Sequence, residues 1–397
     1  MNPAFWDERT IPQHWIQKKL KYVASLQSGD TISPEAIRDE GEFPVYGGNG
    51  FRGYTSAYTH SGDYVLIGRQ GALCGNVNYA SNKFWASEHA IVADTKGKAN
   101  VRWLGELLRA LNLNRLSQSA AQPGLAVDVV ANISIPVPPP DEQKAIADYL
   151  DRETARLDAL IAAKERLLGL LAEKRQSLIT RAVTRGLAPN CFLRDSGIPW
   201  LGPIPAGWAA RRIAWLFRER DYRGEPELPL LEVSINTGVA LREFSDEKIE
   251  STAADFNTYK VARQGDVVFN KMRMWQGAVG VAPEDGLVSP DYVVAAPTGA
   301  LTSEYAGLLF RTPVFSAECG RRSHGIVWDR LRLYWEEFRD ISVPLPSLTE
   351  QAAILAYVAQ ETRKIDDLAS GTSRTIALLK ERRSALIAAA VTGQITV

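Results

Sequence analysis

The sequence has few cysteines, no long apolar run and no signal for export. Three cysteines, Cys74, Cys191 and Cys319, occur in 397 residues, and no two of them form a CxxC pair. A disulfide framework and a zinc ribbon are therefore not expected, and a reducing cytoplasm is the simplest setting. The start, MNPAFWDERT, lacks the basic and apolar regions of a secretory signal. No apolar run approaches the roughly 20 residues that cross a bilayer, so we expect a cytoplasmic protein with no membrane partner.

The sequence also lacks an excess of charge of one sign and any catalytic or metal-binding motif. Lys and Arg number 46, as do Asp and Glu, so a general attraction to nucleic acid is not expected. The four histidines show no HxH or HxxxH spacing, so no metal site is predicted. We interpret NPAF at 2–5 as a chance likeness to the NPPY-type motif of adenine methyltransferases. No catalytic residue is predicted.

A glycine loop follows a short apolar run in FPVYGGNGFRGYT, at residues 43–55. Its G-x-G-x-x-G spacing is typical of the phosphate-binding turn of nucleotide-dependent oxidoreductases. That turn requires a helix directly after the third glycine. The residues that follow, YTSAYTHSGDYVLIG, have no helical period and end in a strand-like run. We therefore expect the glycines to form a tight turn with positive φ, which brings Asn49 and Arg52 to the surface.

The chain repeats itself at an offset of 208 residues. ISIPVPPPDEQKAI at 133–146 returns as ISVPLPSLTEQAAI at 341–354, and the tripeptide AVT recurs at the same offset further along. In each copy prolines end an extended run, and a polar N-cap and a Glu-Gln pair then begin a long helix. IPQHW at 11–15 and IPAGW at 204–208 precede the two copies. A duplicated unit of one globular domain and one long helix is predicted.

The two predicted helices carry matching heptad stripes. On the first, positions 146, 150, 153, 157, 160, 164, 167, 171, 174 and 178 hold Ile, Leu, Glu, Leu, Leu, Lys, Leu, Leu, Lys and Leu. The second has Ile354, Val358, Ile365, Leu368, Leu379 and Leu386, with Glu361 in the polar slot of Glu153. Matched stripes favour an intramolecular coiled coil over packing of each helix on its own domain. SGTS at 370–373 weakens the second helix and allows a kink or a frayed turn.

Several stretches together resemble the specificity subunit of type I restriction-modification enzymes. They are SGIPWLGPIPAGW, the repeated proline and Glu-Gln run, YVLIGRQGALCGNV with WASEHAIV, and FNKMRMWQGAVGV with GLVSPDYVV. The resemblance implies an α+β fold in which two sheet-rich target recognition domains are separated by two long antiparallel helices, with pseudo-twofold symmetry. The expected organisation is a first recognition domain at 1–140, a first spacer helix at 141–187, a second recognition domain at 188–349 and a second spacer helix at 350–397.

The same resemblance implies a function in DNA recognition without catalysis. Each domain of such a subunit reads one half of a split site in double-stranded DNA. The subunit docks two modification subunits, which methylate adenine, and restriction subunits. No cofactor is expected on this chain, whereas S-adenosylmethionine, ATP and Mg are expected on the partner subunits. The alternatives are a subunit of a methylation-only or other restriction system, a nucleotide-dependent oxidoreductase, and a coiled-coil scaffold with no preference for DNA sequence.

Candidate DNA contacts are polar side chains in turns, because Arg suits guanine, Asn and Gln suit adenine, and Lys suits phosphate. The alternative for each is ordinary loop polarity, and Trp275 is expected in the core. The candidates in the first domain are Asn49, Arg52, Arg69, Gln70 and Lys83. Those in the second are Asn270, Lys271, Arg273, Gln276, Arg321, Arg322 and His324.

Overall fold

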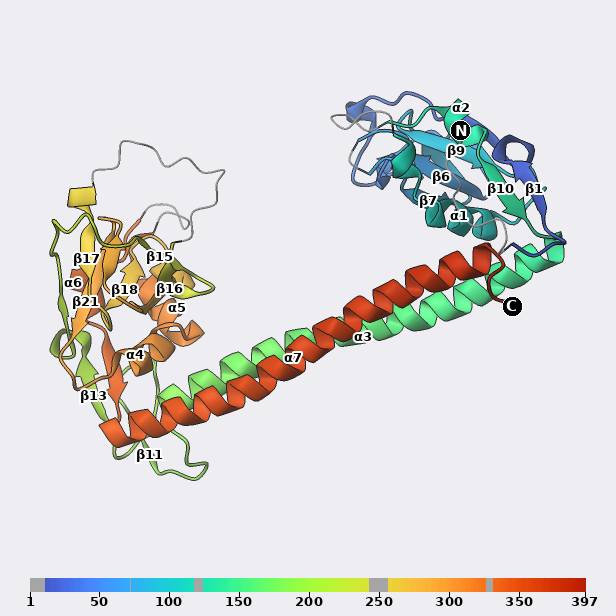
Figure 1. Cartoon of the computed structure of the whole chain (residues 1–397). Helices are drawn as coiled ribbons and strands as arrows, with labels where there is room; N and C mark the ends of the chain where they lie inside the picture. Colours follow the sequence, from blue (N-terminus) through green and yellow to red (C-terminus); the bar gives the residue numbers. More distant parts are fainter. Residues whose placement is uncertain (1–10, 72, 118–123, 243–255, 326–330) are drawn as a thin grey trace. The chain divides into compact units, whose positions relative to one another are not determined.

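A computed structural model describes residues 11–71, 73–117, 124–242, 256–325 and 331–397 (Figure 1). The NPAF stretch lies outside these residues. The chain divides into two compact units, one of Met1–Arg166 with Ser373–Val397 and the other of Leu167–Thr372. We call them unit 1 and unit 2. Among the helices of the described residues, none has the length and apolarity that a membrane crossing requires.

Unit 1 contains two four-stranded sheets. The first has the order β2-β9-β6-β7 and is antiparallel throughout. Its strands are β2 (Ser25–Ser28), β9 (Ala90–Asp94), β6 (Tyr64–Gly68) and β7 (Val77–Ala80). The second has the order β4-β3-β8-β5, in which β3 and β8 run parallel. Its strands are β4 (Gly50–Thr55), β3 (Phe43–Gly47), β8 (Lys83–Ala86) and β5 (His60–Ser61).

Helices and a strand pair complete unit 1. Helix α1 (Val101–Ala110) begins at Asn100, whose side chain accepts a hydrogen bond from the Trp103 backbone N–H at 3.0 Å. Trp103 is fully buried in a core that also takes in the ends of both long helices. The remaining elements are β1 (Ile16–Lys19), which pairs with β10 (Ser134–Val137), the helix α2 (Val127–Ala131), and the short helices η2 (Leu20–Tyr22), η3 (Pro34–Ala36) and η4 (Leu113–Leu116).

Unit 2 repeats the main features of unit 1. Its four-stranded antiparallel sheet has the order β14-β21-β18-β19, a helix follows the sheet, and an early strand pairs with the strand before the long helix. The sheet strands are β14 (Phe217–Glu219), β21 (Tyr292–Pro297), β18 (Val267–Asn270) and β19 (Val279–Val281). The other pairs are β13 (Ala209–Arg212) with β22 (Ser342–Leu345), β15 (Leu231–Ser234) with β16 (Gly238–Leu241), β17 (Lys260–Ala262) with β20 (Gly286–Val288), and β11 (Leu193–Arg194) with β12 (Ile204–Pro205). Its shorter helices are α4 (Ser303–Phe310), α5 (Pro313–Arg322), α6 (Trp335–Arg339), η5 (Ile213–Trp215), η6 (Phe256–Thr258) and η7 (Met274–Gln276).

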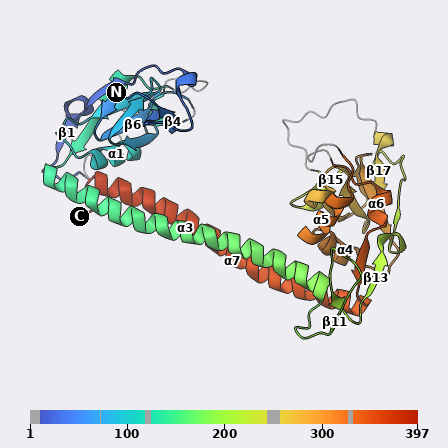
Figure 2. The ribbon, with the colours of Figure 1, turned by 180° about the vertical axis from the view of Figure 1, so that it is seen from behind.

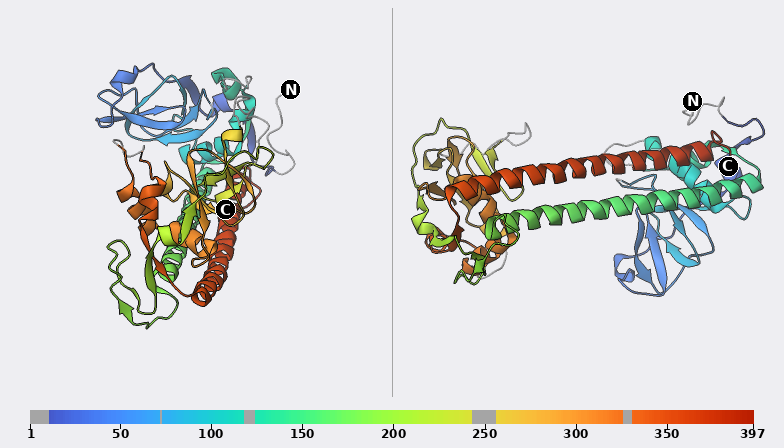
Figure 3. Two further views of the ribbon diagram at one scale, coloured as in Figure 1. Left: turned by 90° about the vertical axis from the view of Figure 1, so that its left-hand side faces the viewer. Right: turned by 90° about the horizontal axis from the view of Figure 1, so that it is seen from below.

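The long helices α3 (Pro140–Arg185) and α7 (Leu348–Val391) pack together in antiparallel fashion. In unit 1, Arg383 donates a hydrogen bond to Asp158 at 2.8 Å, and Lys380 donates one to Glu165 at 3.1 Å. In unit 2, Arg175 forms an ion pair with Asp366. Residue numbers therefore fall along one helix as they rise along the other. Figures 2 and 3 show this pairing in further views. The prediction of an α+β fold with two paired long helices is confirmed.

A buried glutamine joins each long helix to its domain. At the start of α3, Gln143 accepts a hydrogen bond from the Asn100 backbone N–H at 2.8 Å and donates one to the Pro138 carbonyl at 2.9 Å. At the start of α7, Gln351 accepts from the Thr302 backbone N–H at 2.8 Å and donates to the Pro346 carbonyl at 3.0 Å. Since residues 100 and 302 are the N-caps of α1 and α4, the repeated glutamine ties two helix starts together.

The glutamate beside each glutamine has its own repeated contact. The indole N–H of Trp15 donates a hydrogen bond to Glu142 at 2.9 Å, and that of Trp208 donates one to Glu350 at 3.1 Å. The conformation of each tryptophan-containing pentapeptide is thereby linked to the first turn of a long helix. These contacts give a physical reason for the repetition of both the Glu-Gln pair and the I-P-x-x-W pentapeptide.

The buried seam between the helices differs from the predicted stripe at alternate positions. Ile161 is 7% exposed, whereas the predicted Leu160 is 43% exposed. On α7, the predicted Leu368 is likewise exposed. The predicted polar slots of Glu153 and Glu361 are only half-buried, and the neighbouring threonines, at 154 and 362, occupy the seam instead. The predicted stripe and the observed seam share every second position. At the positions between, the seam uses the next residue along the chain, so the predicted phase was wrong there.

Threonine is accommodated in the seam because its hydroxyl donates to its own helix. Thr154 donates to the Leu150 carbonyl at 2.6 Å, and Thr362 donates to the Val358 carbonyl at 2.8 Å. Thr372, within the SGTS stretch, makes the same bond. Helix α7 continues through this stretch, so the frayed turn that the sequence allows is not present.

Replacing each of two adjacent residues tests the phase of the seam. We expect Ile161→Ala to reduce the free energy of unfolding by about 2–5 kcal/mol, because it empties a buried site. The matched control Leu160→Ala is expected to change it by less than about 0.5 kcal/mol. Thermal and denaturant unfolding followed by circular dichroism measures both. A larger loss for the Leu160 variant would contradict the seam described above.

Candidate nucleic-acid interface

Three loops meet at one end of the sheets of unit 1. They are the glycine turn between β3 and β4, the β6–β7 loop and the β8–β9 loop. The Arg69 backbone N–H donates to the His89 carbonyl at 2.8 Å, and the Leu125 backbone N–H donates to the Arg69 carbonyl at 2.9 Å. A Cβ on Gly48 would lie 3.0 Å from the His89 carbonyl oxygen and 3.2 Å from the Gln70 carbonyl oxygen. The glycine therefore allows the three loops to close on one another.

The glycine turn is not a nucleotide-binding turn. Strand β4, rather than a helix, follows it directly. The helix N-terminus that would hold a pyrophosphate is therefore missing from this position, and the oxidoreductase interpretation is wrong. The expected positive φ occurs at Gly50 and Gly53, at +92° and +139°.

The loops of unit 1 bring four of the five predicted contact residues together. Asn49 lies exposed in the glycine turn, and Gln70 lies exposed in the β6–β7 loop beside the half-buried Arg69. The Arg52 side chain lies over Gly47, where a Cβ would be 2.5 Å from its Cδ. The fifth residue, Lys83, lies elsewhere, with its ammonium 4.7 Å from the ring centre of Tyr58.

His89 belongs to the same cluster, although it is not among the contact residues predicted from the sequence. Its Nδ1 lies 3.0 Å from Gln70 Oε1, and its Nε2 lies 3.2 Å from Glu88 Oε1. The pattern that could have indicated it is the Glu-His pair between two apolar runs in WASEHAIV. Such a polar pair directly before a buried strand lies on a strand-connecting loop.

Unit 2 has a corresponding cluster with different side chains. The turn after β18 carries Lys271 and Arg273, and the Leu333 backbone N–H donates to the Lys271 carbonyl at 2.9 Å. This bond corresponds to the one between Leu125 and Arg69 in unit 1. Among the remaining predicted residues, Asn270 ends β18, and His324 pairs with Arg332 through reciprocal backbone hydrogen bonds of 2.9 and 2.8 Å.

Two of the predicted contact residues in unit 2 are engaged by a buried carboxylate. Arg321 donates to Glu318 at 2.7 and 2.8 Å, and Arg322 donates to it at 2.6 Å. Burial opposes ionisation of Glu318, but these hydrogen bonds and the arginine charges outweigh it and lower its pKa. His324 Nε2 similarly lies 3.0 Å from Glu337 Oε1. The charges of Arg321 and Arg322 are therefore partly neutralised within the domain.

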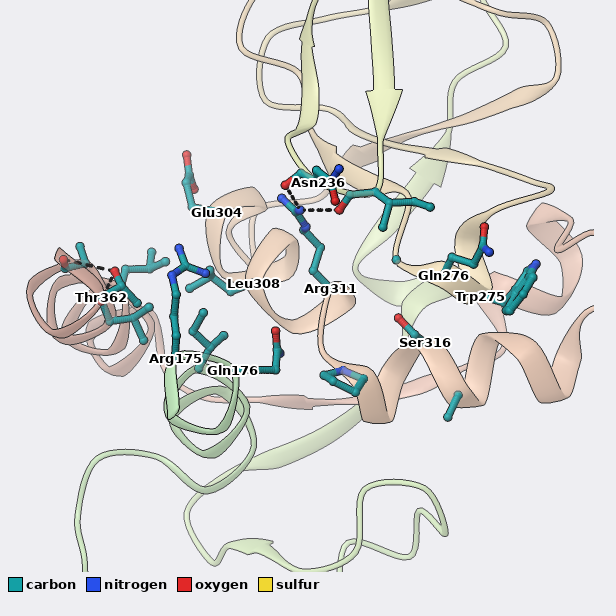
Figure 4. Close-up of a pocket in the computed structure, with 18 residues that line it drawn as sticks. Arg175, Gln176, Asn236, Trp275, Gln276, Glu304, Leu308, Arg311, Ser316 and Thr362 are labelled. Carbon is teal, nitrogen blue, oxygen red and sulfur yellow. Dashed lines mark hydrogen bonds between the residues drawn. The ribbon is translucent and has the colours of Figure 1, made fainter. Parts of the chain in front are cut away.

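A cavity of about 880 Å³ lies beside this cluster, wholly within unit 2 (Figure 4). Gln276 and Trp275 line one side of it, and Arg175 of α3 lines another.

Trp275 is half-buried rather than in the core, and its indole N–H donates to the Met272 carbonyl at 3.0 Å. Arg311 donates to the carbonyl of Ile235 at 2.8 Å, which holds the turn after β15. Burial and the nearby Arg175 charge lower the pKa of Arg311.

Comparison with known proteins gives a consistent family. Residues 12–168 match the model of the type I restriction modification DNA specificity domain. The chain is 40% identical over 140 residues to the type I restriction enzyme EcoprrI specificity subunit of Escherichia coli, covering 34% of this chain and 35% of that protein. It is 22% identical over 416 residues to the EcoDI specificity subunit of the same species, covering 97% and 90%. The alignments to EcoprrI and to the putative specificity subunit of Haemophilus influenzae span about a third of those proteins.

Solved structures of the same class share the fold. One is described as showing complex assembly and conformational transition of the type I R-M system, with a TM-score of 0.70, 17% identity, and coverage of 97% of this chain and 99% of that one. The other is the HsdS subunit from Thermoanaerobacter tengcongensis, with a TM-score of 0.52, 17% identity, and coverage of 97% and 98%. At this identity the likeness concerns the fold. Within the described residues, no cluster of His, Cys, Asp or Glu is suited to holding a metal ion.

Proposed function

Because the chain belongs to the specificity subunits of type I restriction-modification systems, we propose that it selects the double-stranded DNA sequence on which such a system acts. Specificity subunits are recognition components rather than catalytic ones, so this chain is not an enzyme by itself. The observation that carries the proposal is the occurrence of two loop clusters on corresponding sheets. Each presents polar side chains suited to base edges and phosphates.

The two clusters support recognition of a site in two different halves. They share a backbone framework, yet the reading positions after β6 and β18 hold Arg69-Gln70 and Lys271-Met272. Different side chains on the same framework are expected to select different bases. The helix α3 has 46 residues, which corresponds to roughly 70 Å, or about two turns of B-DNA. We propose that the helix pair sets the gap between the two half-sites.

Exposed leucines on the long helices support docking of two like partners. Leu160 and Leu170 on α3 recur at the 208-residue offset as Leu368 and Leu378 on α7, and all four are 43–58% exposed. Single exposed apolar residues are common on protein surfaces, but the recurrence of these four at the repeat offset is what a docking site for two like partners requires. Each unit carries one of these leucines from each helix. The proposed partners are two modification subunits, which bind S-adenosylmethionine, with restriction subunits that use ATP and Mg. A methylation-only system is the alternative.

Domain exchange tests the split site. The chain is co-expressed with its cognate modification subunit, and methylated adenines are mapped across the host genome. We expect one gapped motif. Replacing residues 1–140 by the corresponding domain of another specificity subunit should change one half of the motif and leave the other half and the gap unchanged. A continuous motif, or a change in both halves, would argue against two independent recognition domains.

Charge replacement on the long helices tests the docking surface. We expect Leu160→Glu or Leu368→Glu to remove one modification subunit from the complex, and the double variant to remove both, because a carboxylate cannot be buried without a partner. Native mass spectrometry of the co-expressed complex measures the stoichiometry. Ala162→Glu, which alters an exposed residue off this face of α3, is the control and should retain two subunits. Retention of both subunits by the double variant would contradict the proposal.

Arg321 is engaged by Glu318 and Arg273 is not, so the two arginines are expected to differ in their contribution to DNA binding. The assembled complex is titrated with its DNA at several salt concentrations. Arg273→Ala is expected to reduce the slope of log affinity against log salt by about one, as for the loss of one phosphate contact. Arg321→Ala should reduce that slope by clearly less than one, because Glu318, which also pairs with Arg322, holds the Arg321 guanidinium and partly offsets its charge. An equal effect of the two variants would show that Glu318 does not withhold Arg321 from DNA.

A further inference from the structure

The imidazole of His89 lies between two side chains, and each of them turns an oxygen toward the ring. These oxygens can accept a hydrogen bond but cannot donate one. One is Glu88 Oε1, 3.2 Å from Nε2, and the other is Gln70 Oε1, 3.0 Å from Nδ1. The Gln70 contact requires a hydrogen on Nδ1, and donation to the Glu88 carboxylate, which lies at ion-pair distance from Nε2, would require one on Nε2. A neutral ring carries only one of these hydrogens and can make only one contact in this way.

The neutral ring has a simple alternative that keeps both contacts. If the hydrogen stays on Nε2, facing the Glu88 carboxylate, then Nδ1 becomes an acceptor. The Gln70 carboxamide meets it by turning half a revolution about its last bond, which exchanges the oxygen and the amino group with little change of shape. The state of His89 therefore determines which end of the Gln70 carboxamide faces outward.

The outward end of Gln70 determines which base it can contact. An outward amino group donates to N7 and O6 of guanine, whereas an outward oxygen accepts from N6 of adenine or N4 of cytosine. Gln70 is exposed, and it lies in the loop cluster with Arg69 and Asn49. Charged side chains on the elements that pack here are Glu88, Arg69, Arg52 on β4, and Asp30, whose backbone bridges to Ser87.

We propose that His89 is a positioning residue that fixes the orientation of the Gln70 carboxamide and thereby sets the base preference at one position of the half-site read by the first domain. This inference rests on the proposed function. The contact contributes little to the stability of the free protein, because both side chains are open to water there. The contact becomes important when bound DNA excludes that water. If the Gln70 carboxamide is then turned the wrong way, it places a donor against a donor of the base, or an acceptor against an acceptor, and neither group has a partner.

Two variants at residue 89 separate positioning from structure. An asparagine amide reaches approximately the place of Nδ1, and a glutamine amide reaches that of Nε2. His89→Asn should therefore retain a contact with Gln70, whereas His89→Gln should retain only the one with Glu88. Each variant and Gln70→Ala is co-expressed with the modification subunit, and methylated motifs are mapped. Melting temperatures of the complexes are measured alongside.

We expect Gln70→Ala and His89→Gln to relax preference at the same single base position by about tenfold, while His89→Asn retains the wild-type preference. The half-site of the second domain is the internal control and should not change in any variant. Equal effects of the two His89 variants, effects at different positions, or no effect of Gln70→Ala would overturn the inference. Each of those results is compatible with a gapped motif for the wild-type protein. If the proposed function is wrong, the wild-type protein itself gives no gapped motif.

Discussion

The fold depends most on the buried hydrogen bonds of Gln143 and Gln351. Each glutamine accepts from the backbone N–H of the N-cap residue of a domain helix and donates to a proline carbonyl before a long helix, and both side chains are almost fully buried. A buried backbone N–H or carbonyl without a partner costs free energy. The side chain at each of these two positions must therefore both donate and accept hydrogen bonds, as a glutamine amide does. The long helix consequently leaves its domain in a fixed direction. In both units the loop clusters lie on the domain that this glutamine attaches to a long helix.

The sequence predicts the duplication and the helix pair, because both rest on local and periodic signals. The repeat at 208 residues and the heptads are visible in one dimension. The exact line of burial is not, because apolar residues on α3 occupy two adjacent lines. Ile161 faces the seam and Leu160 faces water. Which of the two lines meets the partner helix is decided by packing, and the exposed leucines outside the seam are where we propose that a further protein docks.

The loop clusters show a different limit. Asn49, Arg52, Arg69 and Gln70 could be selected because polar side chains near glycine are typical of exposed turns. The role of His89 could not, because it depends on a backbone bond between the loops that carry Arg69 and His89. The spacing of Glu318 and Arg321, three residues apart on one helix, is local, but the burial of that carboxylate is a tertiary effect. Residue type thus predicts which side chains can contact DNA, and packing decides which are free to do so.

The proposed function requires that the helix pair space two independent recognition domains. It is tested most directly by inserting one heptad into each long helix where the units divide, between Arg166 and Leu167 and between Thr372 and Ser373. Seven residues keep the seam in phase and add roughly 10 Å, or about three base pairs. The methylated motif of the co-expressed complex should keep both half-sites and gain a gap longer by about that amount. An unchanged gap, or altered half-sites, would contradict the role of the helix pair as the spacer.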